Sequence, residues 1–170
     1  HRYLDAFHVL ETALKPHSEN TDLLYDYAIV AEKLNNTSVM ETALRKVIKL
    51  SPNSQQAYNT LGYSFAERNT RLPEALTLVK KALSLSPKDP YIMDTMGWVQ
   101  YRMGNLVEAE SYLRAAYSTL PDADIAIHLG EVLWVKGDKE AAQKLWRDVH
   151  NKNPKNETLR NTLKRLQVAL

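Results

Sequence analysis

The stretch MDTMGWVQYRMGNLVEAESYLRAA (Met93–Ala116) contains two helical patterns separated by the short turn MGN. Gly97 lies inside the first pattern, where glycine costs about 1 kcal/mol relative to alanine, so we expect a second backbone to approach it closely. Gly104 suits the left-handed end of the first helix. The stretch therefore predicts two closely packed helices. Trp98, next to the glycine, raises the separate question of a ligand.

The same marks recur along the chain at a nearly constant interval. Five of the seven prolines follow helical patterns at spacings of 36, 35, 34 and 33 residues: Pro16, Pro52, Pro87, Pro121 and Pro154. The glycines agree, with one set at Gly62, Gly97 and Gly130 and a second set, seven residues later, at Gly104 and Gly137. A period of this length indicates a solenoid built from helix pairs.

Apolar residues recur at helical spacing in two blocks per period, so each repeat is expected to be a helix pair. The expected helices are 2–14, 20–34, 38–50, 54–68, 73–85, 89–102, 105–119, 123–136, 138–151 and 156–169. Pro73 and Pro90 fit first helical turns, where the missing amide hydrogen has no intrahelical partner to lose. Asn105 and Asp138 are expected to cap the helices that follow them.

The repeat resembles the tetratricopeptide repeat, whose pattern is W-x2-L-G-x2-Y, then A-x3-F, a further alanine and proline. One copy runs Tyr58-x2-Leu61-Gly62-x2-Phe65, then Ala75-x3-Val79, Ala82 and Pro87. Two later copies follow the same pattern, and an earlier one, with alanine in place of glycine, is more degenerate. The resemblance implies an all-α, right-handed superhelical α-solenoid. It also implies that the small residues Gly97 and Ala109 let two helices lie close together.

The resemblance divides the chain into a single array. The expected segments are a half repeat with only its second helix (1–16), four repeats (21–54, 55–89, 90–122 and 123–155) and a capping helix (156–170). An array that begins in mid-repeat suggests a fragment of a longer protein with repeats upstream. Its first helix should then expose Tyr3, Phe7 and Leu10 and support weak self-association through the N-terminal end.

Composition and motifs argue against several functions. With 22 basic and 20 acidic residues, the net charge of +2 offers no basic footprint for nucleic acid, and no apolar run is long enough for a membrane span. The chain has no cysteine, and its five histidines form no metal-binding pattern with acidic partners. It also lacks a glycine-rich phosphate loop and a nucleophile motif. We therefore expect neither an enzyme nor a bound cofactor or metal.

The resemblance also suggests a partner-binding surface. In such arrays the first helix of each repeat lines a concave groove, at positions one after, three before and four after the repeat's glycine. These positions hold Tyr25, Ile29, Glu32, Asn59, Tyr63, Ala66, Asp94, Trp98, Tyr101, Ile127, Glu131 and Trp134. Aromatic side chains are rigid anchors for a bound segment, so partial exposure is expected for Tyr63, Trp98, Tyr101 and Trp134. Trp98 and Trp134 have an equally weighted alternative as core residues, whereas Trp146 occupies the family's buried aromatic position.

A carboxylate-binding clamp, known in chaperone adaptors of this family, is not matched. Its basic and amide positions hold Tyr25, Ile29, Thr60, Tyr91 and Thr95, or, one repeat later, Asn59, Tyr63, Thr95, Asp124 and His128. Acidic residues also outnumber basic ones along the expected groove, so a carboxylate would be poorly received.

These observations favour a non-catalytic scaffold or adaptor that binds a peptide or protein segment in its groove. Two alternatives remain open: an accessory domain of a larger enzyme, and a purely structural, self-associating array. The strings DTMGWVQYRMGNLVEAESYLRAA and HLGEVLWVKGDKEAAQKLWRDV also resemble, more weakly, the last repeats of bacterial envelope adaptors. That resemblance favours the periplasm or outer membrane over the cytoplasm.

Overall fold

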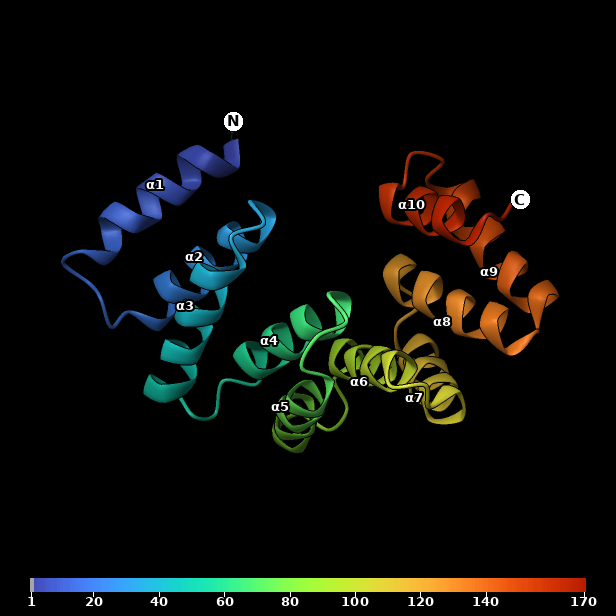
Figure 1. Ribbon diagram of the computed structural model, residues 1–170, viewed down its shortest axis with the longest axis horizontal. Coiled ribbons are helices and arrows are strands. Elements are labelled where there is room, and N and C mark those ends of the chain that lie inside the picture. The colour runs from blue at the N-terminus through green and yellow to red at the C-terminus, as the bar shows by residue number, and fades with distance from the viewer. Residues whose placement is uncertain (1) are drawn as a thin grey trace. The chain divides into compact units, whose positions relative to one another are not determined.

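The computed structural model describes residues 2–170, and within that range all regular secondary structure is helical. Figure 1 shows the helices in chain order. They are α1 (Arg2–Leu14), α2 (Thr21–Lys33), α3 (Thr37–Leu50), α4 (Gln55–Glu67), α5 (Leu72–Leu85), α6 (Pro90–Arg102), α7 (Leu106–Thr119), α8 (Ala123–Lys136), α9 (Lys139–Lys152) and α10 (Glu157–Leu166). None of these helices is long and apolar enough to cross a membrane.

The expected helix boundaries agree with the structure to within one residue, except at the end of α10. That helix ends at Leu166 because Gln167 adopts a left-handed conformation with φ of 57°. Four helices begin with a side-chain cap of 2.9–3.3 Å to the amide three residues on, from Asn20, Asn36, Asp138 and Asn156. The expected cap by Asn105 is wrong, since its amide nitrogen donates to Gln100 Oε1 at 2.8 Å.

The chain forms two compact units, His1–Leu61 and Gly62–Leu170, and the boundary falls within α4. In unit 1, α2 and α3 share an apolar core of Leu24, Ala28, Ala31, Met40, Leu44 and Val47. α1 buries no residue fully. Its Phe7 ring stacks on Tyr27 with centroids 4.7 Å apart, and Phe7 and Leu10 are half-buried. The expected exposure is therefore wrong at these two residues, whereas Tyr3 is exposed, together with Leu4 and Val9.

In unit 2, the helices pair through small residues, as the sequence predicts. A Cβ atom added to Gly97 would lie 2.6 Å from Leu113 Cγ and 3.1 Å from the Ala109 carbonyl oxygen, so α6 and α7 are in direct contact there. Gly130 on α8 faces the Trp146 ring on α9 in the same way. Trp146 is 0% exposed, which confirms it as core.

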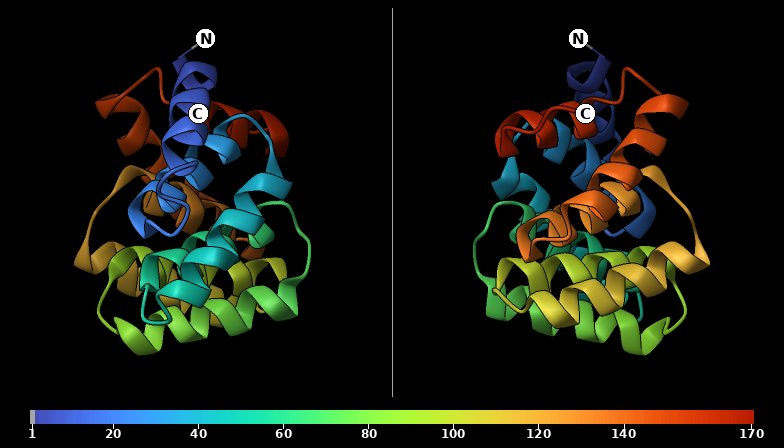
Figure 2. Two further views of the ribbon diagram at one scale, coloured as in Figure 1. Left: turned by 90° about the vertical axis from the view of Figure 1, so that its left-hand side faces the viewer. Right: turned by 90° about the vertical axis from the view of Figure 1, so that its right-hand side faces the viewer.

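The last helix of unit 2 packs across α8 and α9 (Figures 1 and 2). Leu159 and Thr162 of α10 are buried, and Leu163, Leu166 and Val168 pack against the core around Trp146. This arrangement covers the apolar side of α8 and α9 and brings Arg165 beside the polar side of α8.

Candidate partner-binding face

The first helices of the helix pairs, α2, α4, α6, α8 and α10, supply the polar contacts between successive repeats. Two of these contacts join side chains 34 residues apart, Asp94 with His128 and Glu131 with Arg165. Two more span 35 residues: Tyr25 with Thr60 in unit 1, and Arg102 with the Glu67 carbonyl in unit 2. Each spacing is close to one repeat period. Residues in equal phase on neighbouring first helices therefore lie next to one another.

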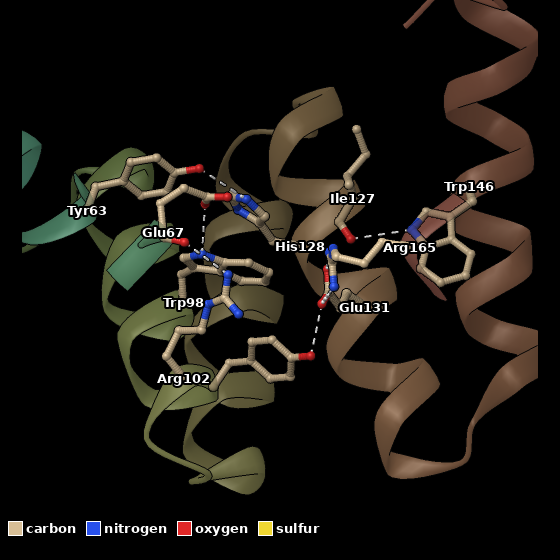
Figure 3. A network of polar contacts seen from close by, with 10 residues as sticks. Tyr63, Glu67, Trp98, Arg102, Ile127, His128, Glu131, Trp146 and Arg165 are labelled. Carbon is tan, nitrogen blue, oxygen red and sulfur yellow. Dashed lines mark hydrogen bonds and ion pairs between the residues drawn. The ribbon is translucent and has the colours of Figure 1, made fainter. Parts of the chain in front are cut away.

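Four helices of unit 2 contribute side chains to one network, drawn in Figure 3. We call it the A-helix face and define it by Tyr63, Glu67, Asp94, Trp98, Tyr101, Arg102, Asp124, His128, Glu131 and Arg165. It has two centres, one at His128 and one at Glu131.

The first centre is a buried imidazole held by two other helices. Only 6% of His128 is exposed. Its Nδ1 lies 2.8 Å from Asp94 Oδ1 of α6, and its Nε2 lies 3.4 Å from the Tyr63 hydroxyl of α4. The ring stacks on Trp98, with centroids 4.2 Å apart and planes at 24°.

Carboxylates govern the electrostatics of this centre. Burial alone would lower the pKa of His128, but Asp94, with smaller contributions from Glu67 and Asp124, outweighs it and raises the pKa above the ordinary value. Burial also raises the pKa of Tyr63, which hydrogen-bonds to Glu67 and lies near the same acidic groups. Tyr63 therefore keeps its hydroxyl proton at any physiological pH.

The second centre is the carboxylate of Glu131, which is 1% exposed. Arg165 donates two hydrogen bonds to it, from Nη1 to Oε1 at 2.8 Å and from Nη2 to Oε2 at 2.7 Å, and Tyr101 donates its hydroxyl to Oε1 at 2.9 Å. The hydrogen bond to Glu131 raises the pKa of Arg165. Burial, followed by the charge of Glu131, raises the pKa of Tyr101 to about 12. A buried charge is thus compensated from α6 and α10.

The structure corrects the expected exposure of Trp98, which is only 2% exposed. His128 covers one part of the indole, Arg102 lies 5.2 Å from its centroid, and Nε1 donates to Glu67 Oε2 at 3.1 Å. Trp98 is therefore a packing platform within the face. It answers the question raised by the sequence, because the tryptophan supports polar side chains of its own chain.

The nine residues proposed for the groove fall into two classes of exposure. Four are buried: Asp94, Trp98, Ile127 and Glu131. Five are half-buried: Tyr25, Asn59, Tyr63, Tyr101 and Trp134. Tyr25 and Asn59 belong to unit 1, and the others to unit 2. Ile127 is turned into the core, with its carbonyl accepting a hydrogen bond from Trp146.

Trp134 lies at the C-terminal end of α8, away from both centres. Its ring lies 5.7 Å from that of Trp146, and the Lys139 ammonium lies 4.8 Å from its centroid. In unit 1, Tyr25 donates to or accepts from Thr60 Oγ1 at 2.9 Å. It also lines a pocket of about 500 Å³ with Thr21, Asp22, Asp26, Val47, Ser51, Ser54 and Gln56.

Sequence reasoning missed Glu67, Arg102 and Arg165, and it treated His128 only as a satisfied or solvent-facing residue. The one-period spacing was the available signal. Opposite charges 34 residues apart, such as Glu131 and Arg165, become neighbours once the repeat is established. Among residues 2–170, no group of three His, Asp or Glu side chains could hold a metal ion. What the face offers is rings and hydrogen-bonding groups for binding.

The family model described as Tetratricopeptide repeat matches residues 39–90 and 95–146. The TPR repeat-containing protein PA4667 of Pseudomonas aeruginosa is 45% identical over 164 residues, which cover 96% of this chain and 28% of that protein. The chain thus spans less than a third of the length of that relative.

Two solved structures show the same fold. A thermophilic TPR protein of Thermus thermophilus, TTC0263, has a TM-score of 0.84 at 22% identity, covering 98% of this chain and 92% of that chain. YrrB, described as a TPR protein with an unusual peptide-binding site, has a TM-score of 0.64 at 17% identity, covering 93% and 84%. The matched segments, with the helix pairs and their glycine contacts, show that this chain belongs to the tetratricopeptide repeat family.

Proposed function

We propose that this chain is a non-catalytic adaptor that binds a peptide or protein segment on the A-helix face of unit 2. Tetratricopeptide repeats act in general as scaffolds for protein–protein interaction. The peptide-binding site named for YrrB supports the finer proposal by analogy of fold alone. The relative from Pseudomonas aeruginosa and the resemblance to envelope adaptors favour a bacterial envelope role.

One observation supports the choice of face more than any other. Tyr63 and Tyr101 are half-buried, and each hydroxyl is held from below by a buried group, His128 and Glu131 respectively. Their rings are therefore oriented before a partner arrives, and pre-ordered side chains lose less entropy on binding. Tyrosine is also one of the residue types that most often dominate binding energy.

The charges on the face suit a partner segment with mixed polarity. Glu67 is exposed on α4, and half of the Arg165 side chain is exposed on α10. Complementary charges of this kind set the register of a bound segment more than its affinity.

The test is a peptide-display selection against the immobilised chain, followed by titrations of the enriched peptides. Tyr63→Ala and Tyr101→Ala should each weaken binding at least about tenfold, as expected for an interface tyrosine. Tyr112→Ala is the matched control, because Tyr112 is equally half-buried but lies on α7, a second helix.

Circular dichroism of each variant separates a loss of binding from a loss of folding. Peptides that bind all three variants equally well, or a failure to enrich any peptide, would contradict binding on this face.

A further inference from the structure

The hydroxyl of Tyr63 lies between two hydrogen-bonding partners and has one proton to donate. One partner is the Glu67 carboxylate on the same helix, four residues later. The other is Nε2 of His128, at 3.4 Å. An ionised carboxylate only accepts hydrogen bonds, whereas an imidazole nitrogen either donates or accepts, depending on its protonation. The direction of the Tyr63 hydroxyl therefore depends on His128.

Asp94 identifies the nitrogen of His128 that titrates. Its Oδ1 lies 2.8 Å from Nδ1 and, as a carboxylate oxygen, must receive a proton from that nitrogen. Nδ1 thus bears a hydrogen in both the neutral and the protonated ring, and the second proton is gained or lost at Nε2. Nε2 is the nitrogen that faces Tyr63.

We propose that the proton at Nε2 of His128 acts as a switch that turns the Tyr63 hydroxyl between Glu67 and His128. With the proton present, Nε2–H donates to the Tyr63 oxygen and Tyr63 donates to Glu67. With the proton lost, Nε2 accepts from Tyr63, and Glu67 loses that hydrogen bond. The proton leaves to solvent and no covalent bond to carbon changes.

The charged groups around the imidazole favour the protonated ring. They are Glu67 from α4, Asp94 from α6 and Asp124 on α8 itself, and together they keep the pKa of His128 above its ordinary value despite burial. The cations of the face have other contacts. Arg102 of α6 lies over the Trp98 ring, and Arg165 of α10 binds Glu131.

The helices packed on the other side of α8 bring their charges to a different place. Glu110 of α7 pairs with Lys136, eight residues beyond His128 and so about two helical turns away. Trp146 of α9 faces the core.

A proton switch at this position changes the surface that we propose as the partner site. Glu67 is the exposed carboxylate of the face, and its free lone pairs increase by one when Tyr63 turns away. This consequence for binding rests on the proposed function, but the switch itself is a property of the free chain.

The chain contains internal references for a nuclear magnetic resonance titration. His8, His17 and His150 are exposed, whereas His128 is buried. Between about pH 5.5 and about pH 9, the ring resonances of His128 should titrate with a midpoint above those of the three references, which should lie near the ordinary value of about 6.5. Asp94→Asn should lower the midpoint of His128. A midpoint at or below the references would overturn the proposal.

Glu67 reports the turn of the hydroxyl. Its side-chain carboxyl carbon shift should show an inflection at the His128 midpoint in the wild-type chain, and Tyr63→Phe should remove that inflection while His128 still titrates. Phenylalanine keeps the ring and removes only the hydroxyl, so folding is preserved. An inflection that persists in Tyr63→Phe would show simple charge coupling without the hydroxyl, and would overturn the switch.

Stacking on Trp98 offers a second measurement. Protonation of a stacked imidazole quenches indole fluorescence, so the emission of the wild-type chain should fall as the pH drops through the His128 midpoint, and Trp98→Phe should remove this change. Peptides that enrich on the face should then change affinity at least about threefold across the midpoint, a typical size for a coupled equilibrium. Failure to enrich peptides would count against the proposed function alone, whereas constant affinity across the midpoint would overturn the link from switch to face.

Discussion

Replacing Gly130 by alanine should destabilise the chain, although alanine is the better helix former. The added Cβ would lie 2.7 Å from Cε2 and 2.9 Å from Cδ1 of Trp146, and closer still to Nε1. The indole is 0% exposed and its Nε1 donates to the Ile127 carbonyl at 3.3 Å, so the ring has no free space to move into. Overpacking costs about 1–3 kcal/mol, while helix propensity returns about 1 kcal/mol, which leaves a net loss of about 1–2 kcal/mol.

Urea unfolding followed by circular dichroism measures this loss, and a double variant tests its cause. In a Trp146→Leu background the indole is absent, so Gly130→Ala should no longer destabilise and should instead add up to about 1 kcal/mol. A change of sign between the two backgrounds is the expected outcome. If Gly130→Ala were neutral or stabilising in the wild-type background, the close approach of α8 and α9 at this glycine would be refuted.

Three further predictions concern other contacts. Ala109→Leu should overpack the contact with Gly97 and lower the free energy of unfolding by about 1–3 kcal/mol, measurable as a lower urea midpoint. For Arg165→Met, which leaves the buried Glu131 with one partner, the expected loss is about 1–3 kcal/mol, below the range for a fully buried pair because Arg165 is half-exposed; Lys164→Met, an exposed neighbour, is the control and should change little. Val9 is 67% exposed on α1, so weak, concentration-dependent self-association is expected in sedimentation and should diminish in Val9→Glu; a wild-type chain that stays monomeric at high concentration would contradict it.

The pH dependence of stability follows from His128. Its folded pKa is raised above the unfolded value of about 6.5, so the imidazolium contributes stability that is fully present below about pH 6.5 and is lost as the pH rises through the folded pKa. Urea midpoints measured across this range should fall with rising pH in the wild-type chain. The slope should flatten in His128→Gln, and an unchanged slope would contradict the assignment.

The helix pairs could be predicted because their signals are local and repeat along the sequence. Gly97, Gly104 and Gly137 mark a close contact and two turns, and a backbone without a side chain has few other reasons to recur at one phase. Trp146 could be assigned to the core because the family's pattern places an aromatic residue against the glycine of the preceding helix.

The exposure of the face could not be predicted in the same way. Helical phase states the direction in which Trp98 points, but its exposure depends on whether the next repeat brings a side chain over it. Here that side chain is His128, which lies one position after a predicted groove residue. A charge such as Glu131 is equally ambiguous, because its burial is tolerable only when Arg165 and Tyr101 reach it from two other helices.

The one-period spacing of the polar pairs limits how this part of the array evolves. Tandem duplication lengthens a solenoid by inserting a whole repeat, and the backbone of α6–α9 would accept such an insertion without strain. A new helix placed between α6 and α8 would separate Asp94 from His128 and leave a buried carboxylate without its partner, at a cost of about 3–5 kcal/mol. A new helix between α8 and α10 would do the same to Glu131. The repeats from α6 to α10 are therefore modular in backbone but not in sequence, and a recombined array would have to inherit them as one block.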